Sequence, residues 1–158
     1  MAGQTRQGRN DENLRQSALL LLTSGQVKGG LTRNMRKRIL LVEDNEELLE
    51  LLTLHLKHEG FSVSTATSGV QAVKKARSSP PDLILLDLML PEMDGFGVCQ
   101  TLRRHEATAH VPILILSGAT GQLTRLAGLE SGGTDFITKP ASPSDLASKI
   151  RAALTPAQ

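Results

Sequence analysis

Five polar residues that could act together follow apolar runs of the sequence. Glu43 and Asp44 follow the first run, Asp87 the third and Ser117 the fourth, and Lys139 lies just after the fifth. Three carboxylates held close together repel one another and stay ionised only beside a compensating cation. Oxygen ligands with no histidine or cysteine nearby suit Mg²⁺ or Mn²⁺ better than zinc. With the metal, the lysine and the hydroxyl would surround a small oxyanion such as a phosphoryl group.

These residues converge only if the apolar runs are neighbouring parallel strands. The runs are Ile39–Val42, Phe61–Ala66, Leu83–Leu86, Ile113–Leu116 and Phe136–Thr138. Continuous hydrophobicity is typical of strands buried on both faces of a parallel sheet. Stretches of helical period alternate with them, at Leu48–His55, Val70–Ala76, Val98–Leu102, Leu123–Leu129 and Leu146–Leu154. The alternation predicts a doubly wound α/β fold of five strands and five helices, with its ligand site beyond the carboxyl ends of the strands.

Each polar residue also has a purely structural interpretation. Asp44 or Asn45 could cap the following helix, with Glu47 completing an arrangement like a capping box. Ser117 could satisfy local backbone groups, and Lys139 could be a solvated surface lysine. Asp87 is harder to explain in this way, because an ionised carboxylate at the end of an apolar strand is costly unless it is paired. Their joint position at strand ends favours the chemical interpretation.

Three segments resemble the receiver domain of bacterial two-component response regulators. The type that they resemble is the single-domain chemotaxis regulator. The three segments are the acceptor-like segment Asp87–Gly95, the acidic segment Val42–Asn45 and the final segment Gly133–Pro140. The spacings of 43 residues from Asp44 to Asp87, 30 to Ser117 and 22 to Lys139 also suit that family. The resemblance covers residues 37–155. It implies a flavodoxin-like sheet with strand order 2-1-3-4-5.

The resemblance also implies a role for each acidic residue. Asp87 would be the phosphoacceptor, which attacks phosphorus and becomes an aspartyl phosphate. Asp44 and Asp87 would bind Mg²⁺ directly, with the backbone carbonyl of Met89, and Glu43 would act through a water molecule. The phosphoryl donor would be a histidine kinase or a phosphotransfer protein of a phosphorelay.

The same resemblance implies a switch. Lys139 would pair with one phosphoryl oxygen and Ser117 would hydrogen-bond another, while Pro140 is a candidate for a cis peptide bond. Movement of Ser117 would vacate space for Phe136, whose alternative role is simply that of a core residue. The surface that signals to a downstream protein partner would be Leu123–Ser131 and Phe136–Leu154.

A few positions depart from the family pattern or look structural. Gly118 stands where the family more often has alanine, which predicts a looser loop. Thr134 replaces a frequent acidic residue, and Met89 and Ala119 would flank the phosphoryl site. Four further positions are interpreted as structural: Asp94 as a helix N-cap, His55 and His58 as surface histidines, and Cys99 as a packing residue.

The remainder of the chain has a different charge. Residues 1–38 carry eight Lys/Arg against two acidic residues, or +6, whereas the other 120 carry ten against fourteen, or −4. We interpret residues 1–36 as a basic, flexible arm and 37–155 as the receiver domain.

A single cysteine predicts a reducing compartment. Because the longest apolar run of the arm is too short for a signal peptide or a membrane span, we expect a cytoplasmic protein.

Two other functions compete with the signalling receiver, which would not itself be an enzyme. A Mg²⁺-dependent phosphatase-like hydrolase would need an aspartate two residues after the nucleophile, and Met89 stands there. The alternative from another class is a receiver-fold interaction module whose basic arm contacts DNA phosphates. The scarcity of aromatic residues argues against single-stranded nucleic acid as the main ligand.

Overall fold

The computed structural model describes residues 36–118 and 121–155 of the chain. The chain divides after Met35, one residue before the end of the predicted arm. The flexibility predicted for the arm, and the place predicted for Ala119, lie outside the described residues. No helix of the described part has the length and apolarity needed to cross a membrane.

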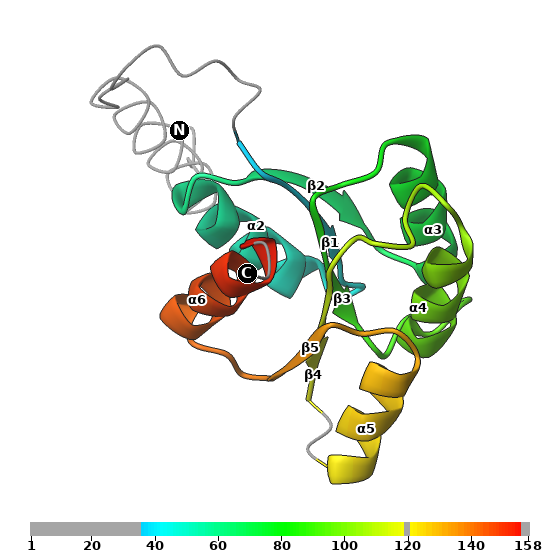
Figure 1. Cartoon of the computed structure of the whole chain (residues 1–158). Helices are drawn as coiled ribbons and strands as arrows, with labels where there is room; N and C mark the ends of the chain where they lie inside the picture. The colour runs from blue at the N-terminus through cyan, green and yellow to red at the C-terminus, as the bar shows by residue number, and fades with distance from the viewer. Residues whose placement is uncertain (1–35, 119–120, 156–158) are drawn as a thin grey trace, which may run out of the picture. The chain divides into compact units, whose positions relative to one another are not determined.

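Five parallel strands form one sheet in the order β2-β1-β3-β4-β5 (Figure 1). The strands are β1 (Arg38–Val42), β2 (Ser62–Ala66), β3 (Leu83–Asp87), β4 (Ile113–Ser117) and β5 (Asp135–Thr138). The strand order reverses between β1 and β3, because β1 lies beside both β2 and β3. A ligand site of a doubly wound sheet lies at such a point. The predicted fold class and strand order are confirmed.

Burial follows position in the sheet. β3 and β4 are buried throughout, and β1 is buried after its first residue. The prediction of a continuous apolar run was wrong for β2, where Ser62 and Ser64 are exposed and Val63 and Thr65 half-buried. β2 is an edge strand, so part of it faces solvent and tolerates the alternation.

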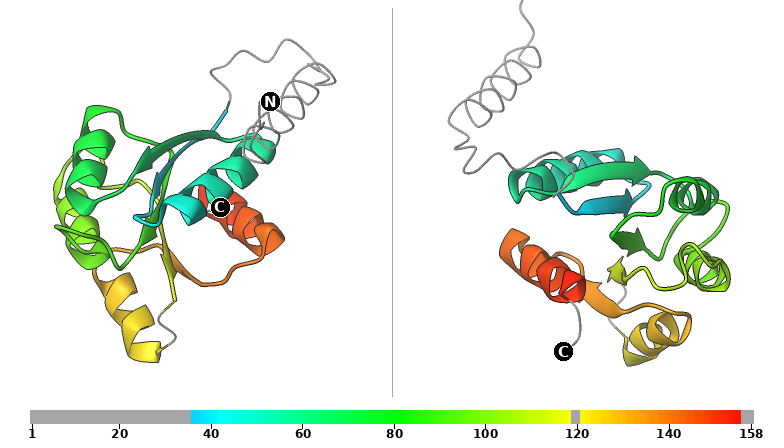
Figure 2. Two further views of the ribbon diagram at one scale, coloured as in Figure 1. Left: turned by 180° about the vertical axis from the view of Figure 1, so that it is seen from behind. Right: turned by 45° about the horizontal axis from the view of Figure 1, so that its top comes forward.

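Helices cover both faces of the sheet (Figure 2). They are α2 (Glu46–His58), α3 (Gly69–Ser78), α4 (Gly95–Arg104), α5 (Gln122–Glu130) and α6 (Pro143–Leu154). α2 and α6 lie side by side on one face, where Leu56 and Ile150 pack against Ile39 and Leu85. α3, α4 and α5 cover the other face, where the second apolar cluster contains Leu40, Ile84 and Ile115. The two clusters take alternate residues of each strand, as the two-residue period of a strand requires.

The helix N-caps show which polar residues near the strand ends have a structural role. Asn45 caps α2, because its side-chain oxygen accepts a hydrogen bond of 3.0 Å from the Leu48 N–H. Leu48 thus takes the third helical position, which a capping box would give to an acidic residue, so Glu47 does not complete one. Asp44 is left available for another task. The predicted N-cap role of Asp94 is confirmed by its bond of 2.9 Å from the Gly97 N–H.

Arg103 ties α4 to the beginnings of β4 and β5, a role that the sequence analysis did not predict. Its guanidinium donates to the carbonyls of Gly132 at 2.9 Å, Ala109 at 3.0 Å and Val111 at 2.5 Å. Burial lowers the pKa of Arg103. Thr134 assists, because its hydroxyl accepts a bond of 3.0 Å from the Ile113 N–H. The departure at Thr134 therefore has a structural explanation.

Candidate functional site

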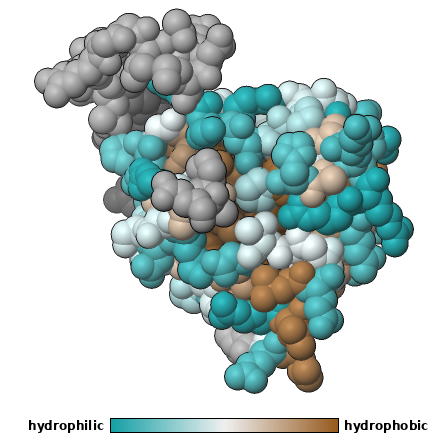
Figure 3. Space-filling view, in the orientation of Figure 1, coloured by the Kyte–Doolittle hydropathy of each residue, from teal (hydrophilic) through white to brown (hydrophobic). Residues whose placement is uncertain are grey.

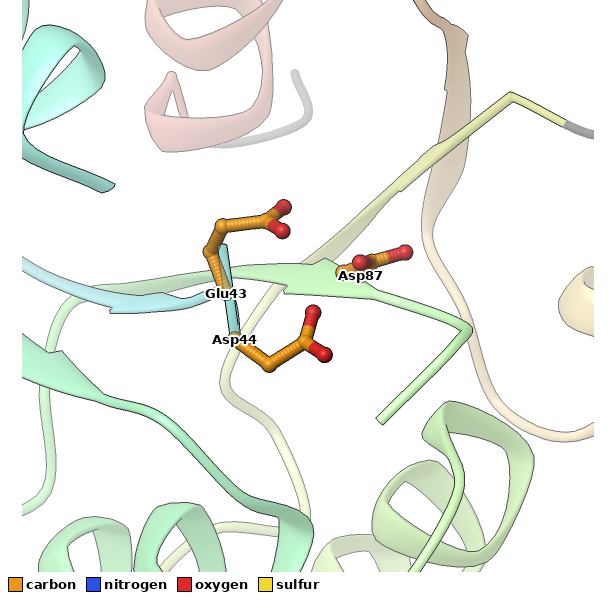
Figure 4. A group of neighbouring side chains, drawn as sticks. All are labelled: Glu43, Asp44 and Asp87. Atoms are coloured by element: carbon orange, nitrogen blue, oxygen red, sulfur yellow. The ribbon is translucent and has the colours of Figure 1, made fainter. Parts of the chain in front are cut away.

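Three carboxylates meet beyond the carboxyl ends of β1 and β3. Glu43 and Asp44 directly follow β1, and Asp87 is the last residue of β3. One carboxylate oxygen from each lies within 4.8 Å of one from each of the others. Figure 4 shows the three side chains pointing into one region. The sequence-predicted convergence of these residues is present in the structure.

Glu43 is held by hydrogen bonds on both carboxylate oxygens. Its Oε1 accepts a bond of 3.2 Å from the Asn45 N–H, and its Oε2 accepts one of 2.8 Å from Lys139 Nζ. Burial raises the pKa of Glu43, the Lys139 hydrogen bond opposes the rise, and the charge of Asp87 adds to it. Three acidic groups beside one ammonium leave an excess of negative charge at this edge.

Lys139 reaches this cluster from the loop after β5. Its Nζ lies 2.8 Å from Glu43 Oε2 and 3.4 Å from Asp87 Oδ2. The pKa of Lys139 lies above its ordinary value: burial lowers it, but the Glu43 hydrogen bond and the charges of Asp87 and Glu43 outweigh that effect. The Lys139–Pro140 peptide bond is cis, as predicted. Lys139 is thus a partly buried ion-pair partner and not a solvated surface lysine.

Asp87, Ser117 and Met89 complete the predicted set. Asp87 is nearly buried, and its Oδ1 accepts a bond of 3.1 Å from the Met89 N–H. Ser117 is buried at the end of the neighbouring strand, and its carbonyl accepts a bond of 2.8 Å from the Lys139 N–H. Met89 is 76% exposed, so its side chain is not part of the buried floor of the site.

The donor set fits a hard divalent cation. Asp44 is exposed and not used as a helix cap, so its carboxylate can take a ligand. Three carboxylates supply oxygen atoms, and no described histidine or cysteine belongs to the cluster. Such a set favours Mg²⁺ over zinc. His55 and His58, in contrast, belong to no metal-binding group of the described residues.

A family profile decides the relationship to known proteins. Residues 39–151 match the response regulator receiver domain. The chain belongs to this family. The chain is 46% identical over 120 residues to the DNA-binding response regulator MtrA of Mycobacterium tuberculosis. The aligned region covers 76% of this chain and 51% of that protein. The chain therefore spans about half the length of this curated relative.

Solved structures agree with the family assignment. A putative response regulator from Chloroflexus aurantiacus has a TM-score of 0.73 and 32% identity, covering 75% of this chain and 98% of that one. The receiver domain of sensor histidine kinase PA1611 from Pseudomonas aeruginosa has a TM-score of 0.72 and 31% identity, with the same coverage. That structure contains a magnesium ion coordinated in the active-site cleft.

Phe136 lies inside the receiver domain and not on its surface. It is 5% exposed and belongs to the apolar cluster that contains Ile115. Gly128 of α5 lies close by, because a Cβ at that position would stand 2.8 Å from Ile115 Cδ1 and 3.8 Å from Phe136 Cδ2. This placement suits both a core residue and a residue that moves with α5, so the two interpretations stay open.

Cys99 is a packing residue, as predicted. It is fully buried in α4 and forms no disulfide. Burial raises the pKa of its thiol to about 11. The neutral thiol is therefore the form present near pH 7, which argues against a nucleophilic role.

The Gly118 loop can be tested by adding one methyl group. No described atom lies within 4 Å of the position that a Cβ would take, and the φ angle of Gly118 is not left-handed. We expect Gly118→Ala to raise the free energy of unfolding by about 0.4–1 kcal/mol, since it restricts the unfolded chain. Urea denaturation measures the change.

Gly60 provides the matched control. A Cβ there would also meet open space, but its φ of +93° is left-handed. Gly60→Ala should therefore lower the free energy of unfolding, by about 1–2 kcal/mol. Equal effects of the two substitutions would contradict the conclusion that the backbone at Gly118 accepts an alanine without strain.

Proposed function

We propose that this receiver domain accepts a phosphoryl group on Asp87 from a histidine kinase or phosphotransfer protein. The supporting observation is the meeting of Glu43, Asp44 and Asp87 with Lys139 beyond the carboxyl ends of the strands. A carboxylate nucleophile needs nearby positive charge, because the incoming phosphoryl group is itself an anion. The domain then acts in a two-component phosphorelay as a signalling protein.

Each residue has a defined task in this proposal. Asp87 attacks phosphorus and becomes an aspartyl phosphate, and the donor keeps the leaving group. Asp44, Asp87 and the Met89 carbonyl hold Mg²⁺, with Glu43 acting through water; when bound, the metal offsets charge on the transferring group. Lys139 pairs with a phosphoryl oxygen and Ser117 donates a hydrogen bond to another.

The signal leaves through α5, β5 and α6. Leu123 and Leu126 of α5 are 82% and 52% exposed, and Gly128 is the buried residue of that helix. Figure 3 shows hydrophobic surface over α5. A helix with so little buried surface can change position at low cost, which suits an equilibrium between two packings. We propose that a downstream protein contacts this face.

Intact-mass spectrometry tests the phosphoryl transfer. The whole chain is incubated with a small acyl-phosphate donor, with Mg²⁺ or with a chelator. We expect a gain of one phosphoryl group that requires Mg²⁺, and peptide mapping should place it on Asp87. A gain that is equal in chelator, or a label on serine or threonine, would contradict the proposal.

Nucleic-acid binding is the second candidate function. The relative MtrA is named as DNA-binding, and residues 1–38 of this chain carry a net charge of +6. Binding through phosphate contacts would weaken steeply as salt rises, because counterions are released from DNA. Affinity for duplex DNA that does not change between low and physiological salt would exclude this role of the basic residues.

A further inference from the structure

A second hollow lies between β2 and α3, away from the acidic cluster. It has a volume of about 470 Å³, and its lining includes Arg38, Ser64, Lys74, Lys75 and Ser79. Arg38 begins β1 and Ser79 follows α3, so the hollow lies toward the amino ends of the strands. The acidic cluster, which includes the proposed acceptor Asp87, lies at their carboxyl ends.

Ser64 of β2 lines the hollow on the side of the sheet. Ser64 is the register partner of Leu40 on the neighbouring strand, so both side chains face α3. Leu40 also lines the hollow, but it is only 1% exposed. The solvent-exposed part of the lining therefore includes side chains of α3, among them Lys74 and Lys75. The volume falls within the range of sites for small molecules.

Three cationic groups surround the hollow without a carboxylate in its lining. Among the described residues Arg38, Lys74 and Lys75 form no ion pair. The guanidinium of Arg38 donates to the carbonyls of Pro80 at 3.3 Å and Ser79 at 3.4 Å, and to the Ser79 hydroxyl. Lys75 Nζ donates to the Thr65 carbonyl. All these acceptors are neutral, so the positive charges are not neutralised.

The cationic side chains around the hollow have N–H donors that no described acceptor uses. An arginine has five N–H donors and a lysine three. Arg38 uses three of its donors and Lys75 one, while no described acceptor is hydrogen-bonded to Lys74 Nζ. Asp82 is the nearby acidic residue, and its Oδ2 accepts a bond of 2.7 Å from the Arg38 backbone N–H.

Stabilisation of a helix end does not account for the arrangement. Cations in the last turn of a helix interact favourably with its dipole, and Lys75 and Arg77 lie in the last turn of α3. Arg38, however, belongs to β1, and its guanidinium reaches across to the segment that follows α3. Charges from two elements therefore gather around one hollow.

We propose that this hollow binds a small organic anion that carries a phosphate group. The phosphate oxygens accept hydrogen bonds from Arg38, Lys74 and Lys75, because three cations match a doubly charged group with several acceptor atoms. The organic part packs against the aliphatic stems of the lysines. This site does not depend on phosphoryl transfer to Asp87.

Phenyl phosphate is a suitable probe, since it joins an apolar body to a phosphate. The whole chain, without Mg²⁺, is titrated with phenyl phosphate at physiological salt while backbone amide NMR shifts are followed. We expect saturable shifts at Ser64, Lys74, Lys75 and Ser79. Inorganic phosphate and phenol, which correspond to the two halves of the probe, should each bind more weakly.

Matched charge variants identify the site. The double variant Lys74→Gln/Lys75→Gln should weaken binding about tenfold or more, since charge-assisted hydrogen bonds are lost. Lys57→Gln on α2 changes an exposed charge elsewhere and should have no effect. Asp87→Asn should also bind normally, which separates this proposal from phosphoryl transfer. The proposal would be overturned if Lys57→Gln weakened probe binding as much as Lys74→Gln/Lys75→Gln does. It would also be overturned if the NMR shifts caused by the probe were centred on Asp87 and Lys139.

Discussion

Asp87→Asn should abolish the uptake of a phosphoryl group from an acyl-phosphate donor while leaving the fold intact. An amide has nearly the shape of the carboxylate but is not a nucleophile toward phosphorus. The Asp87 Oδ1 that accepts from the Met89 N–H can be replaced by the amide oxygen. The substitution also removes one of three mutually repelling carboxylates. We therefore expect no loss of the free energy of unfolding in the absence of Mg²⁺.

Intact-mass spectrometry and urea denaturation check both halves of this expectation. Asp145→Asn is the matched control, because it makes the same chemical change at an exposed position in the first turn of α6. The control should gain one phosphoryl group as the natural sequence does. Stoichiometric labelling of Asp87→Asn would remove Asp87 from the role of acceptor. A variant that is unlabelled only because it is unfolded would be exposed by the denaturation curve.

The sheet was predictable because its central strands carry a strong and simple signal. Leu83–Leu86 and Ile113–Leu116 are continuous apolar runs, and both lie in fully buried strands. The edge strand was less predictable. Ser62 and Ser64 alternate with half-buried residues, since an edge strand lacks a neighbour on one side. Its environment depends on strand order, which local sequence does not contain.

The acidic cluster was predictable for a related reason. Parallel strands bring residues that follow them to one edge, so position along the sequence becomes proximity in space. The choice between Asp44 and Asn45 as helix cap was not predictable, because both side chains can accept from a helix N–H. The structure assigns the cap to Asn45. Only three-dimensional geometry separates the two adjacent residues.

Long-range hydrogen bonds were missed altogether. Arg103 reads as one more basic residue on a helix, yet its guanidinium binds carbonyls up to 29 residues away in the sequence. The cationic hollow is similar, since Arg38 and Lys74 come from different elements. No periodicity or spacing rule identifies such partners. These long-range contacts can be recognised only from the three-dimensional structure of the loops.

Lys139→Ala should leave Mg²⁺ binding intact but prevent the phosphorylation-dependent change in α5, β5 and α6. The three carboxylates that would hold the metal are all retained in this variant. The group that is lost is the ammonium that would draw the phosphoryl oxygens toward β5, so phosphorylation would no longer change the relative energy of the two packings. NMR spectra of the whole chain, before and after an acyl-phosphate donor is added, measure the change at Leu123–Ser131. Lys149→Ala, which removes a half-exposed ammonium from α6, should still switch.

The same substitution should make the stability of the protein depend on Mg²⁺. Without Lys139, Glu43 loses the hydrogen bond of 2.8 Å on its Oε2, and three carboxylates face one another with no ammonium between them. We expect a loss of about 1–3 kcal/mol in the free energy of unfolding when Mg²⁺ is absent. Added Mg²⁺ should recover most of this loss, because a ligand that binds only the folded state stabilises it and here replaces the missing positive charge. A variant that switches normally, or whose stability ignores Mg²⁺, would show that Lys139 is a structural ion-pair partner and not the residue that reads the phosphoryl group.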